Sequence, residues 1–201
     1  MINEDIMTKP TEEEARECLE TLIRYIGEDP EREGLVETPD RILRMWKEIF
    51  RGYNPEEKPK ITTFNNDLGL SDMIFDCGDY YSMCEHHILP FFGRYYIAYI
   101  PSPFGKILGL SKIARVVEYC AAKLQLQERL AVEIVEMLSE ALNGKEFGFA
   151  IMMKGTHLCK CMRGVKNEGT MSVAYYTGEF RQSPALRKEF QQMIQANQSH
   201  L

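Results

Sequence analysis

The chain has 201 residues, of which 44 % are hydrophobic, 27 % charged and 10 % aromatic, a composition that argues against intrinsic disorder and fibrous structure. Its 30 acidic and 24 basic residues give a net charge of −6, so we expect no general affinity for nucleic acid or anionic membranes. No apolar run reaches the roughly 18 residues of a membrane helix, and the N-terminal sequence lacks an export signal. We therefore expect a soluble, cytoplasmic protein whose cysteines are thiols or metal ligands rather than disulfides.

Two amphipathic helices are predicted in the first quarter of the chain. The first begins with a capping box formed by Thr11 and Glu14, and apolar residues follow at helical spacing for about four turns. The second begins at Thr38, where Pro39 suits the first turn, and its apolar stripe ends before Gly52. Together they make a helical N-terminal arm.

The character of the sequence changes at residues 54–60, which are polar and contain two prolines. We place the domain boundary here, with the helical arm over 1–53 and a second domain over 54–201. Segments of this domain are either rich in β-branched and aromatic residues or helical in pattern, which predicts an α+β fold. The predicted strands are 61–64, 73–75, 94–100, 147–154, 156–162 and 171–180, and the predicted helices are 111–123, 127–142 and 184–196.

Three of the four histidines lie in two motifs that also carry cysteines. The motif Cys-Glu-His-His at 84–87 holds a thiolate and an imidazole that can share one ion if the chain turns between them. The segment 156–163 has polar residues at every second position, so a strand there would place them all on one face. These residues are His157, Cys159, Cys161 and Arg163.

Zinc suits this set of donors best, because cysteine sulfur and imidazole nitrogen are its usual ligands. Three protein ligands and one open position define a catalytic site. We assign the metal to Cys84, His87 and Cys159, which leaves His86 and His157 for proton transfer. The alternative is core packing, since cysteine is often buried. We expect core packing for the cysteines outside the two motifs, which are Cys18, Cys77 and Cys120.

Two predicted helix starts carry residues suited to an anionic or purine ligand. Ser111 begins one helix, where free backbone N–H groups can bind phosphate, and Lys112 and Arg115 lie within its first turn. Gln127 and Glu128 begin the next, and a carboxylate there can accept paired N–H donors from a base such as guanine. The simpler alternatives are solvated charges at a capped helix and a carboxylate that complements the helix dipole. Further basic residues for a phosphate site are Arg163, Arg41 and Arg44.

Over about residues 11–194 the sequence resembles the zinc-dependent GTP cyclohydrolase I family. The resemblance rests on five motifs in the family's order: Gly27-Glu28-Asp29-Pro30 with Glu37-Thr38-Pro39-Asp40-Arg41, Ser82-Met83-Cys84-Glu85-His86-His87 with Pro90-Phe91, Gly109-Leu110-Ser111-Lys112 with Arg115, Gln125-Leu126-Gln127-Glu128-Arg129, and His157-Leu158-Cys159 with Arg163-Gly164. It implies a T-fold, a strand-strand-helix-helix-strand-strand unit that assembles into a toroidal homo-oligomer, typically a decamer.

The resemblance also implies an activity and a role for each motif. Such an enzyme converts GTP and water to 7,8-dihydroneopterin triphosphate and formate, the first step of tetrahydrofolate and pterin biosynthesis, with a zinc-activated water attacking C8 of the purine. The positions that match the family's zinc ligands are Cys84, His87 and Cys159, and those that match its proton-transfer histidines are His86 and His157. Ser111 and His157 serve the sugar end. The matching substrate-binding positions are Gln127 and Glu128 for guanine, Ser111, Lys112, Arg115 and Arg163 for the triphosphate, and Arg41 and Arg44 for phosphate contacts from an adjacent subunit.

Two features of the second domain depart from the family pattern. Cys161 stands where the family usually has an apolar residue, and 167–176 is more apolar and aromatic than the usual Ser/Thr-rich strand. Two main alternatives to this activity stay open. One is an enzyme that stops at the formamidopyrimidine after the first hydrolysis, and the other is a zinc-stabilised binding protein in which Cys161 is a fourth ligand. A dinucleotide-dependent T-fold reductase is the weakest alternative, because no nucleotide-binding fingerprint is present.

Overall fold

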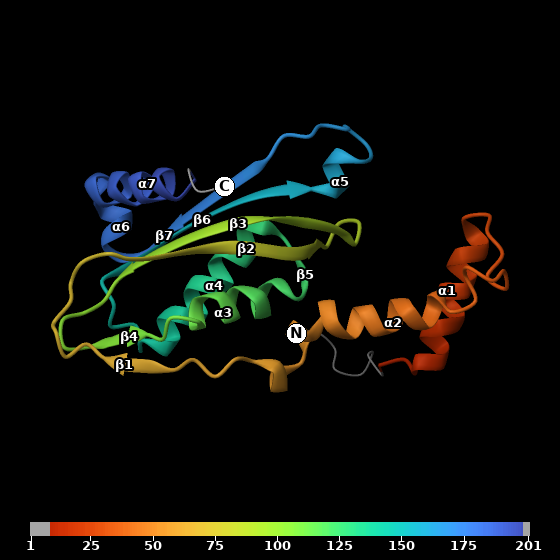
Figure 1. Ribbon diagram of the computed structural model, residues 1–201, viewed down its shortest axis with the longest axis horizontal. Coiled ribbons are helices and arrows are strands. Elements are labelled where there is room, and N and C mark those ends of the chain that lie inside the picture. The colour runs from red at the N-terminus through yellow and green to blue at the C-terminus, as the bar shows by residue number, and fades with distance from the viewer. Residues whose placement is uncertain (1–8, 199–201) are drawn as a thin grey trace, which may run out of the picture. The chain divides into compact units, whose positions relative to one another are not determined.

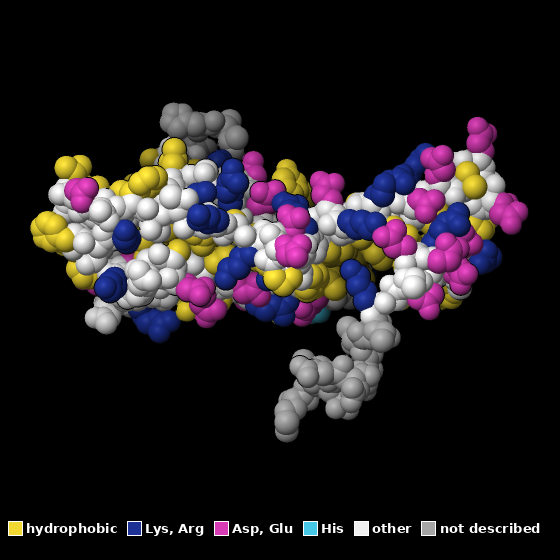
Figure 2. Space-filling view, turned by 90° about the horizontal axis from the view of Figure 1, so that it is seen from below, with side chains coloured by type: hydrophobic (Ala, Val, Ile, Leu, Met, Phe, Trp, Pro, Cys, Tyr) yellow, Lys and Arg dark blue, Asp and Glu magenta, His cyan; other side chains and the backbone are white. Residues whose placement is uncertain are grey.

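The computed structural model describes residues 9–198 of the chain. The chain divides between Arg51 and Gly52 into two compact units. No helix within the described residues is long and apolar enough to cross a membrane. On the face shown in Figure 2, basic and acidic side chains are interspersed and hydrophobic groups are exposed between them.

The smaller unit contains the two helices α1 (Glu12–Tyr25) and α2 (Thr38–Ile49). The Thr11 hydroxyl accepts a hydrogen bond from the backbone N–H of Glu14, and the Glu14 carboxylate accepts one from the Thr11 N–H at 2.7 Å. The predicted capping box is therefore confirmed. Lys47 of α2 pairs with Glu12 of α1 at 2.6 Å, which joins the two helices at the surface.

The larger unit is built on a five-stranded sheet with the strand order β5-β2-β3-β6-β7. Strands β2, β3, β6 and β7 pair antiparallel, and β5 pairs with β2 in parallel. Two short 3₁₀ turns come before it in the chain. Strands β1 and β4 form a separate two-stranded sheet (Figure 1). The bounds are η2 (Arg51–Tyr53), η3 (Pro55–Glu57), β1 (Thr63–Asn65), β2 (Ile74–Cys84), β3 (Leu89–Ile100), β4 (Lys106–Leu108), β5 (Leu124–Gln125), β6 (Gly148–His157) and β7 (Met171–Tyr176).

Helices cover both faces of this sheet, which explains the continuous apolar run at 95–100 of β3 (Figure 1). On one face, Tyr95, Ile97 and Tyr99 join the core formed with α3 (Lys112–Ala121) and α4 (Gln127–Ala141). On the other, the alternate residues pack with Phe180 of α6 (Gly178–Gln182) and Phe190 of α7 (Pro184–Gln198). The fold is mixed α+β, as the sequence predicts.

One predicted strand is wrong. Strand β6 continues through His157, and residues Leu158–Cys161 then form a single helical turn, α5. The alternating residues from His157 to Arg163 therefore do not share a strand face. The prediction failed because a polar residue at every second position does not distinguish a strand from a four-residue helical turn, and this stretch contains no β-branched residue after Thr156.

Two further predictions need correction. The predicted strand at 171–180 ends at Tyr176, because the Thr177 hydroxyl accepts from the Phe149 N–H at 2.8 Å and the chain turns into α6. Cys18 is exposed rather than part of a core, since α1 buries Leu19 and Ile23 instead. Cys120 is fully buried as predicted, and burial raises the pKa of its thiol to about 12.

Replacing Gly93 with Ala should disrupt the centre of the sheet. A Cβ atom at this position of β3 would overlap the Lys154 carbonyl oxygen and lie 2.8 Å from Gly155 Cα on β6. We expect the free energy of unfolding in urea to fall by about 1–3 kcal/mol. Gly34→Ala is the control, since its nearest neighbour is the flexible end of Arg32 at 3.0 Å. A Gly93→Ala variant as stable as this control would contradict the register of β3 and β6.

Candidate active site

Two cysteines from distant parts of the chain meet at one end of the sheet. Cys84 is the buried last residue of β2, and Cys159 lies in the α5 turn that follows β6. Their sulfur atoms are 3.6 Å apart. This distance is far longer than a disulfide bond of about 2.05 Å. It is close to the roughly 3.8 Å that separates two sulfurs bound to one tetrahedral zinc at about 2.3 Å each.

His157, the last residue of β6, completes a group of possible metal ligands. One ligand atom from each of Cys84, His157 and Cys159 lies within 4.8 Å of the others. The imidazole stacks on Phe91 of β3 with ring centroids 4.5 Å apart and an angle of 7°. Sulfur and imidazole donors of this kind suit zinc, so the residues present fit the metal that the sequence predicts.

The buried side chain of Gln127 determines which nitrogen of His157 carries the proton. The Gln127 amide N–H₂ donates to the backbone oxygens of Met153 at 2.9 Å and Met171 at 3.3 Å, which fixes the orientation of the amide. Its oxygen lies 2.9 Å from His157 Nε2 and can only accept, so Nε2 carries the proton. The lone pair on Nδ1 is then available to an ion or a proton.

The pKa values of His157 and Cys159 shift in the directions that favour their neutral forms. Burial lowers the pKa of His157, and the charge of Glu128 opposes that shift. Burial also raises the pKa of Cys159, and the hydrogen bond and charge of the Cys84 sulfur raise it further. A neutral imidazole is the form that binds a metal, whereas both thiols must lose their protons to do so. A divalent cation bound by the two sulfurs would favour that loss of protons.

The other two predicted histidines lie in the turn between β2 and β3. His86 and His87 are exposed, and their rings are nearly perpendicular at 81°. The turn includes Ile88 at a positive φ of 51°, which is strained for a β-branched residue. His87 Nε2 lies 2.7 Å from the Arg163 guanidinium, which can only donate, so Nε2 accepts. The structure thus places His157, not His87, with the two cysteines.

The residues predicted to bind the base differ in exposure. Gln127 is 1 % exposed, and its amide is fully engaged with β6, β7 and His157. Glu128 is exposed on the first turn of α4. The sequence marks both as a pair, but local sequence carries no signal for the contacts that Gln127 makes with residues far along the chain. Glu128 is therefore the member of the pair that a ligand can reach.

The predicted phosphate-binding residues lie on three elements. Ser111 precedes α3 and its side chain makes no capping hydrogen bond, and Ser111 and Arg115 are both exposed. Arg163 follows α5 and contacts the β2–β3 turn through His87. Arg41 and Arg44 are exposed on α2 of the smaller unit, where Arg41 pairs with Glu37 at 2.6 Å.

The larger unit is thus an α+β domain with a group of two cysteines and one histidine that could hold a metal ion, as the ligands of a metalloprotein do. A family model described as GTP cyclohydrolase I matches residues 15–195. The chain belongs to the GTP cyclohydrolase I family.

Two bacterial relatives of similar length support this membership. The proteins named GTP cyclohydrolase 1 from Rickettsia typhi and Rickettsia prowazekii are each 44 % identical to it over 191 residues, covering 94 % of this chain and 98 % of theirs. A crystal structure of the archaeosine synthase QueF-Like in the apo form overlaps with a TM-score of 0.42 at 18 % identity, over 53 % of this chain and 93 % of that one.

Replacing Gln127 with Leu should destabilise the site from within. The carbonyl groups of Met153 and Met171 would lose their donor, and His157 would lose its acceptor. We expect the free energy of unfolding in urea to fall by about 1–3 kcal/mol, because buried polar groups would be left unpaired. Glu128→Gln, at the exposed neighbouring position, should change it by less than about 0.5 kcal/mol. Equal effects of the two substitutions would contradict the buried hydrogen bonds of Gln127.

Proposed function

We propose that this protein is a GTP cyclohydrolase I that converts GTP and water to 7,8-dihydroneopterin triphosphate and formate, the first step of tetrahydrofolate and pterin biosynthesis. The observation that carries the proposal is the close approach of Cys84 and Cys159, whose sulfur atoms lie 3.6 Å apart with His157 beside them. Membership of the family and the name of its relatives, GTP cyclohydrolase 1, support the same activity.

The proposed cofactor is Zn²⁺, held by the two cysteines and one histidine. When bound, zinc supplies the Lewis acidity that makes water a nucleophile toward purine C8 near neutral pH. We assign the histidine to His87, as the family resemblance implies, which requires its ring to leave Arg163. The triphosphate of GTP is a stronger acceptor for that guanidinium than a neutral imidazole. With His87 turned toward the metal, Arg163 would be free to bind the triphosphate, and His157 would remain available for proton transfer.

The remaining residues of the site bind substrate and move protons. Glu128 is proposed to accept the paired N–H donors of guanine, since its carboxylate is exposed at the start of α4. His86 is the proposed donor to the imidazole-ring nitrogen of the purine, and His157 and Ser111 serve the sugar end. Gln127 keeps the His157 proton on Nε2. The proposed triphosphate contacts are Lys112, Arg115 and Arg163, with Arg41 and Arg44 contributed by an adjacent subunit.

We further propose a T-fold catalytic domain over 54–201, with a helical arm over 1–53, and assembly into a toroidal homo-oligomer of decamer type. Among residues 9–198, strand β7 has a partner strand on only one side, so its other edge can pair with a second copy. Tyr81 and Phe92 stack on each other at an exposed position of β2 and β3, with Tyr81 74 % exposed. Exposed aromatic pairs of this kind are typical of surfaces that become buried between subunits.

The group of possible ligands favours turnover over a purely structural metal. Within residues 9–198 it consists of three side chains and does not include Cys161, although Cys161 lies in the same helical turn as Cys159. Three protein ligands leave one position for water or substrate. A zinc-stabilised binding protein would instead need Cys161 as a fourth ligand.

Zinc-loaded, reduced protein should release one formate per GTP and yield a pterin that fluoresces after oxidation. Cys159→Ala should lose both zinc and formate release, whereas Cys161→Ala should keep both. The histidines can be separated by metal content, because a variant that loses a ligand loses zinc and a variant that loses a proton donor keeps it. We expect His87→Ala to lose zinc and His157→Ala to retain it while releasing formate more slowly.

Three outcomes would contradict parts of this proposal. No reaction with GTP by the zinc-loaded wild type would overturn the activity. A product with the mass of GTP plus one water, without formate, would limit the enzyme to the first hydrolysis. Zinc loss in His157→Ala but not in His87→Ala would transfer the ligand role to His157.

A further inference from the structure

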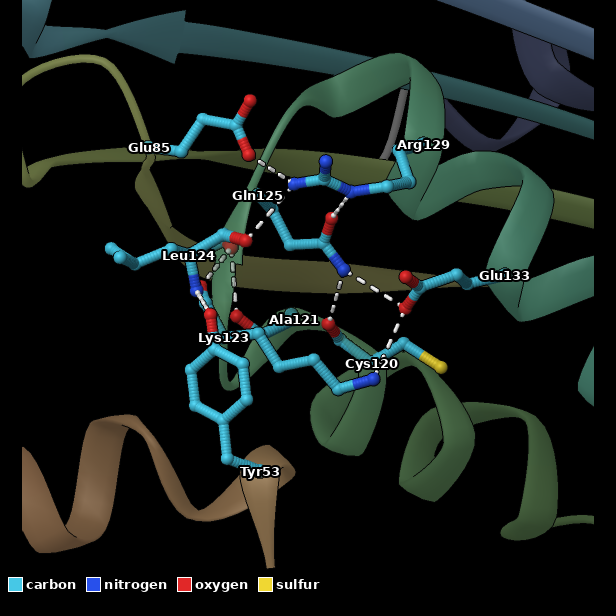
Figure 3. Close-up of polar contacts among 10 residues, drawn as sticks. Tyr53, Glu85, Cys120, Ala121, Lys123, Leu124, Gln125, Arg129 and Glu133 are labelled. Atoms are coloured by element: carbon cyan, nitrogen blue, oxygen red, sulfur yellow. Dashed lines mark hydrogen bonds and ion pairs between the residues drawn. The ribbon is translucent and has the colours of Figure 1, made fainter. Parts of the chain in front are cut away.

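Arg129, on the first turn of α4, makes hydrogen bonds to both residues of β5 and to the turn between β2 and β3 (Figure 3). Its Nη2 atom donates to the Glu85 carboxylate and, at 3.1 Å, to the carbonyl oxygen of Leu124. Its Nε atom donates to the side-chain oxygen of Gln125 at 2.9 Å. The planar guanidinium is suited to hold several acceptors in one fixed arrangement.

A second layer of hydrogen bonds fixes Gln125 behind this arginine. Gln125 is 1 % exposed, and its amide donates to the Cys120 carbonyl at the end of α3 and to Glu133 on the next turn of α4, both at 2.9 Å. Lys123 binds the same Glu133 oxygen at 3.2 Å. A buried side chain whose hydrogen bonds are satisfied, as in Gln125, is held rigidly, so Gln125 gives Arg129 a fixed anchor.

Glu85 is bound to Gln125 and Arg129 through two separate hydrogen bonds. Its backbone N–H donates to the Gln125 carbonyl at 3.2 Å, where β5 runs parallel to the end of β2, and its side chain binds Arg129. The residue lies directly between Cys84 and His86 in the strained turn that precedes β3. A turn that contains a β-branched residue at positive φ needs restraint from its surroundings to keep one conformation.

We propose that Glu85 and Arg129 form a positioning pair, which fixes the turn carrying Cys84, His86 and His87 relative to the first turn of α4 that carries Glu128. This inference rests on the proposed function, because it concerns the distance between the metal-binding residues and the residue that holds the base. Neither member of the pair is a catalytic residue. Both act through the backbone that they join.

The pair is better suited to positioning than to stabilising the fold. The side chains of Arg129 and Glu85 are 43 % and 33 % exposed, and ion pairs at that exposure add little to global stability. An open hollow of about 540 Å³ lies beside them, so substitutions there do not overpack a core. Loss of the pair should therefore change the site while the domain stays folded.

The test is a double-mutant cycle with Glu85→Gln, Arg129→Gln and the double variant at saturating zinc. Each single substitution should lower kcat for formate release by about 10- to 100-fold, the effect of a misplaced reacting group, and change KM for GTP by less than about 3-fold. The double variant should be no slower than the slower single one, since all three lose the same contact. Arg129→Lys should recover only part of the rate, because an ammonium cannot span three acceptors.

Titration with Co²⁺ gives a readout independent of turnover. Its visible absorption reports occupancy of the sulfur-containing site, and loss of a second layer of contacts typically weakens metal affinity about 10-fold or more. We expect this weakening in Glu85→Gln and Arg129→Gln. Glu140→Gln is the matched control, because it removes an exposed ion pair with Lys58 of 3.8 Å near the far end of α4. The control should match the wild type in thermal unfolding, cobalt affinity and kcat.

The results separate the positioning pair from the proposed activity. An inactive wild type would overturn the activity alone, and the cobalt titration would then decide the pair. Cobalt affinities equal to that of the wild type would overturn the pair, as would additive losses of kcat in the double variant. A thermal unfolding temperature that falls in step with kcat across the variants would also overturn it, since the role would then be structural.

Discussion

The register of three antiparallel strands is the constraint on which the site depends. Strand β3 lies between β2 and β6, and it pairs Leu89 with Cys84 on one side and Phe91 with His157 on the other. These two pairings on β3 bring the thiols of Cys84 and Cys159 together, although the two cysteines are 75 residues apart in the sequence. A slip of one residue in the register would turn Cys84 or His157 to the opposite face of the sheet, and the three possible metal ligands would no longer lie together. The buried apolar faces of β3 prevent that slip.

Local patterns predict the helices well because each start and face is encoded nearby. The capping box at Thr11 and the apolar stripe of α4, the helix that begins at Gln127, can both be recognised without information from the rest of the chain. The turn after His157 is different. Its polar residues suit a strand equally well, and only the packing of α5 against β3 selects the helical form. Cysteines 84 and 159 still meet, although the reasoning that placed Cys159 on a strand face was wrong.

The side chains around the possible metal ligands show which features of the site sequence patterns cannot predict. Motifs select the two histidines of the turn and His157, but they cannot say which ring faces the sulfurs, because that depends on partners far away. Gln127 holds one ring through carbonyl groups of β6 and β7, and Arg163 engages another. Neither contact has a local signature. The sequence thus identifies the members of the site, and tertiary packing assigns their hydrogen bonds.

The apolar run of β3 has a consequence for how the protein is made. Its two faces become covered only when α3, α4 and α7 are present, and all of them follow β3 in the chain. On the ribosome, β3 emerges next to β2, with which it forms a hairpin through the turn at 85–88. That hairpin exposes apolar surface until the later helices have been synthesised and can cover it. A delay in translation at this stage would therefore favour aggregation. Cys84 of β2 likewise has no sulfur partner until Cys159, 75 residues further along the chain, has been synthesised.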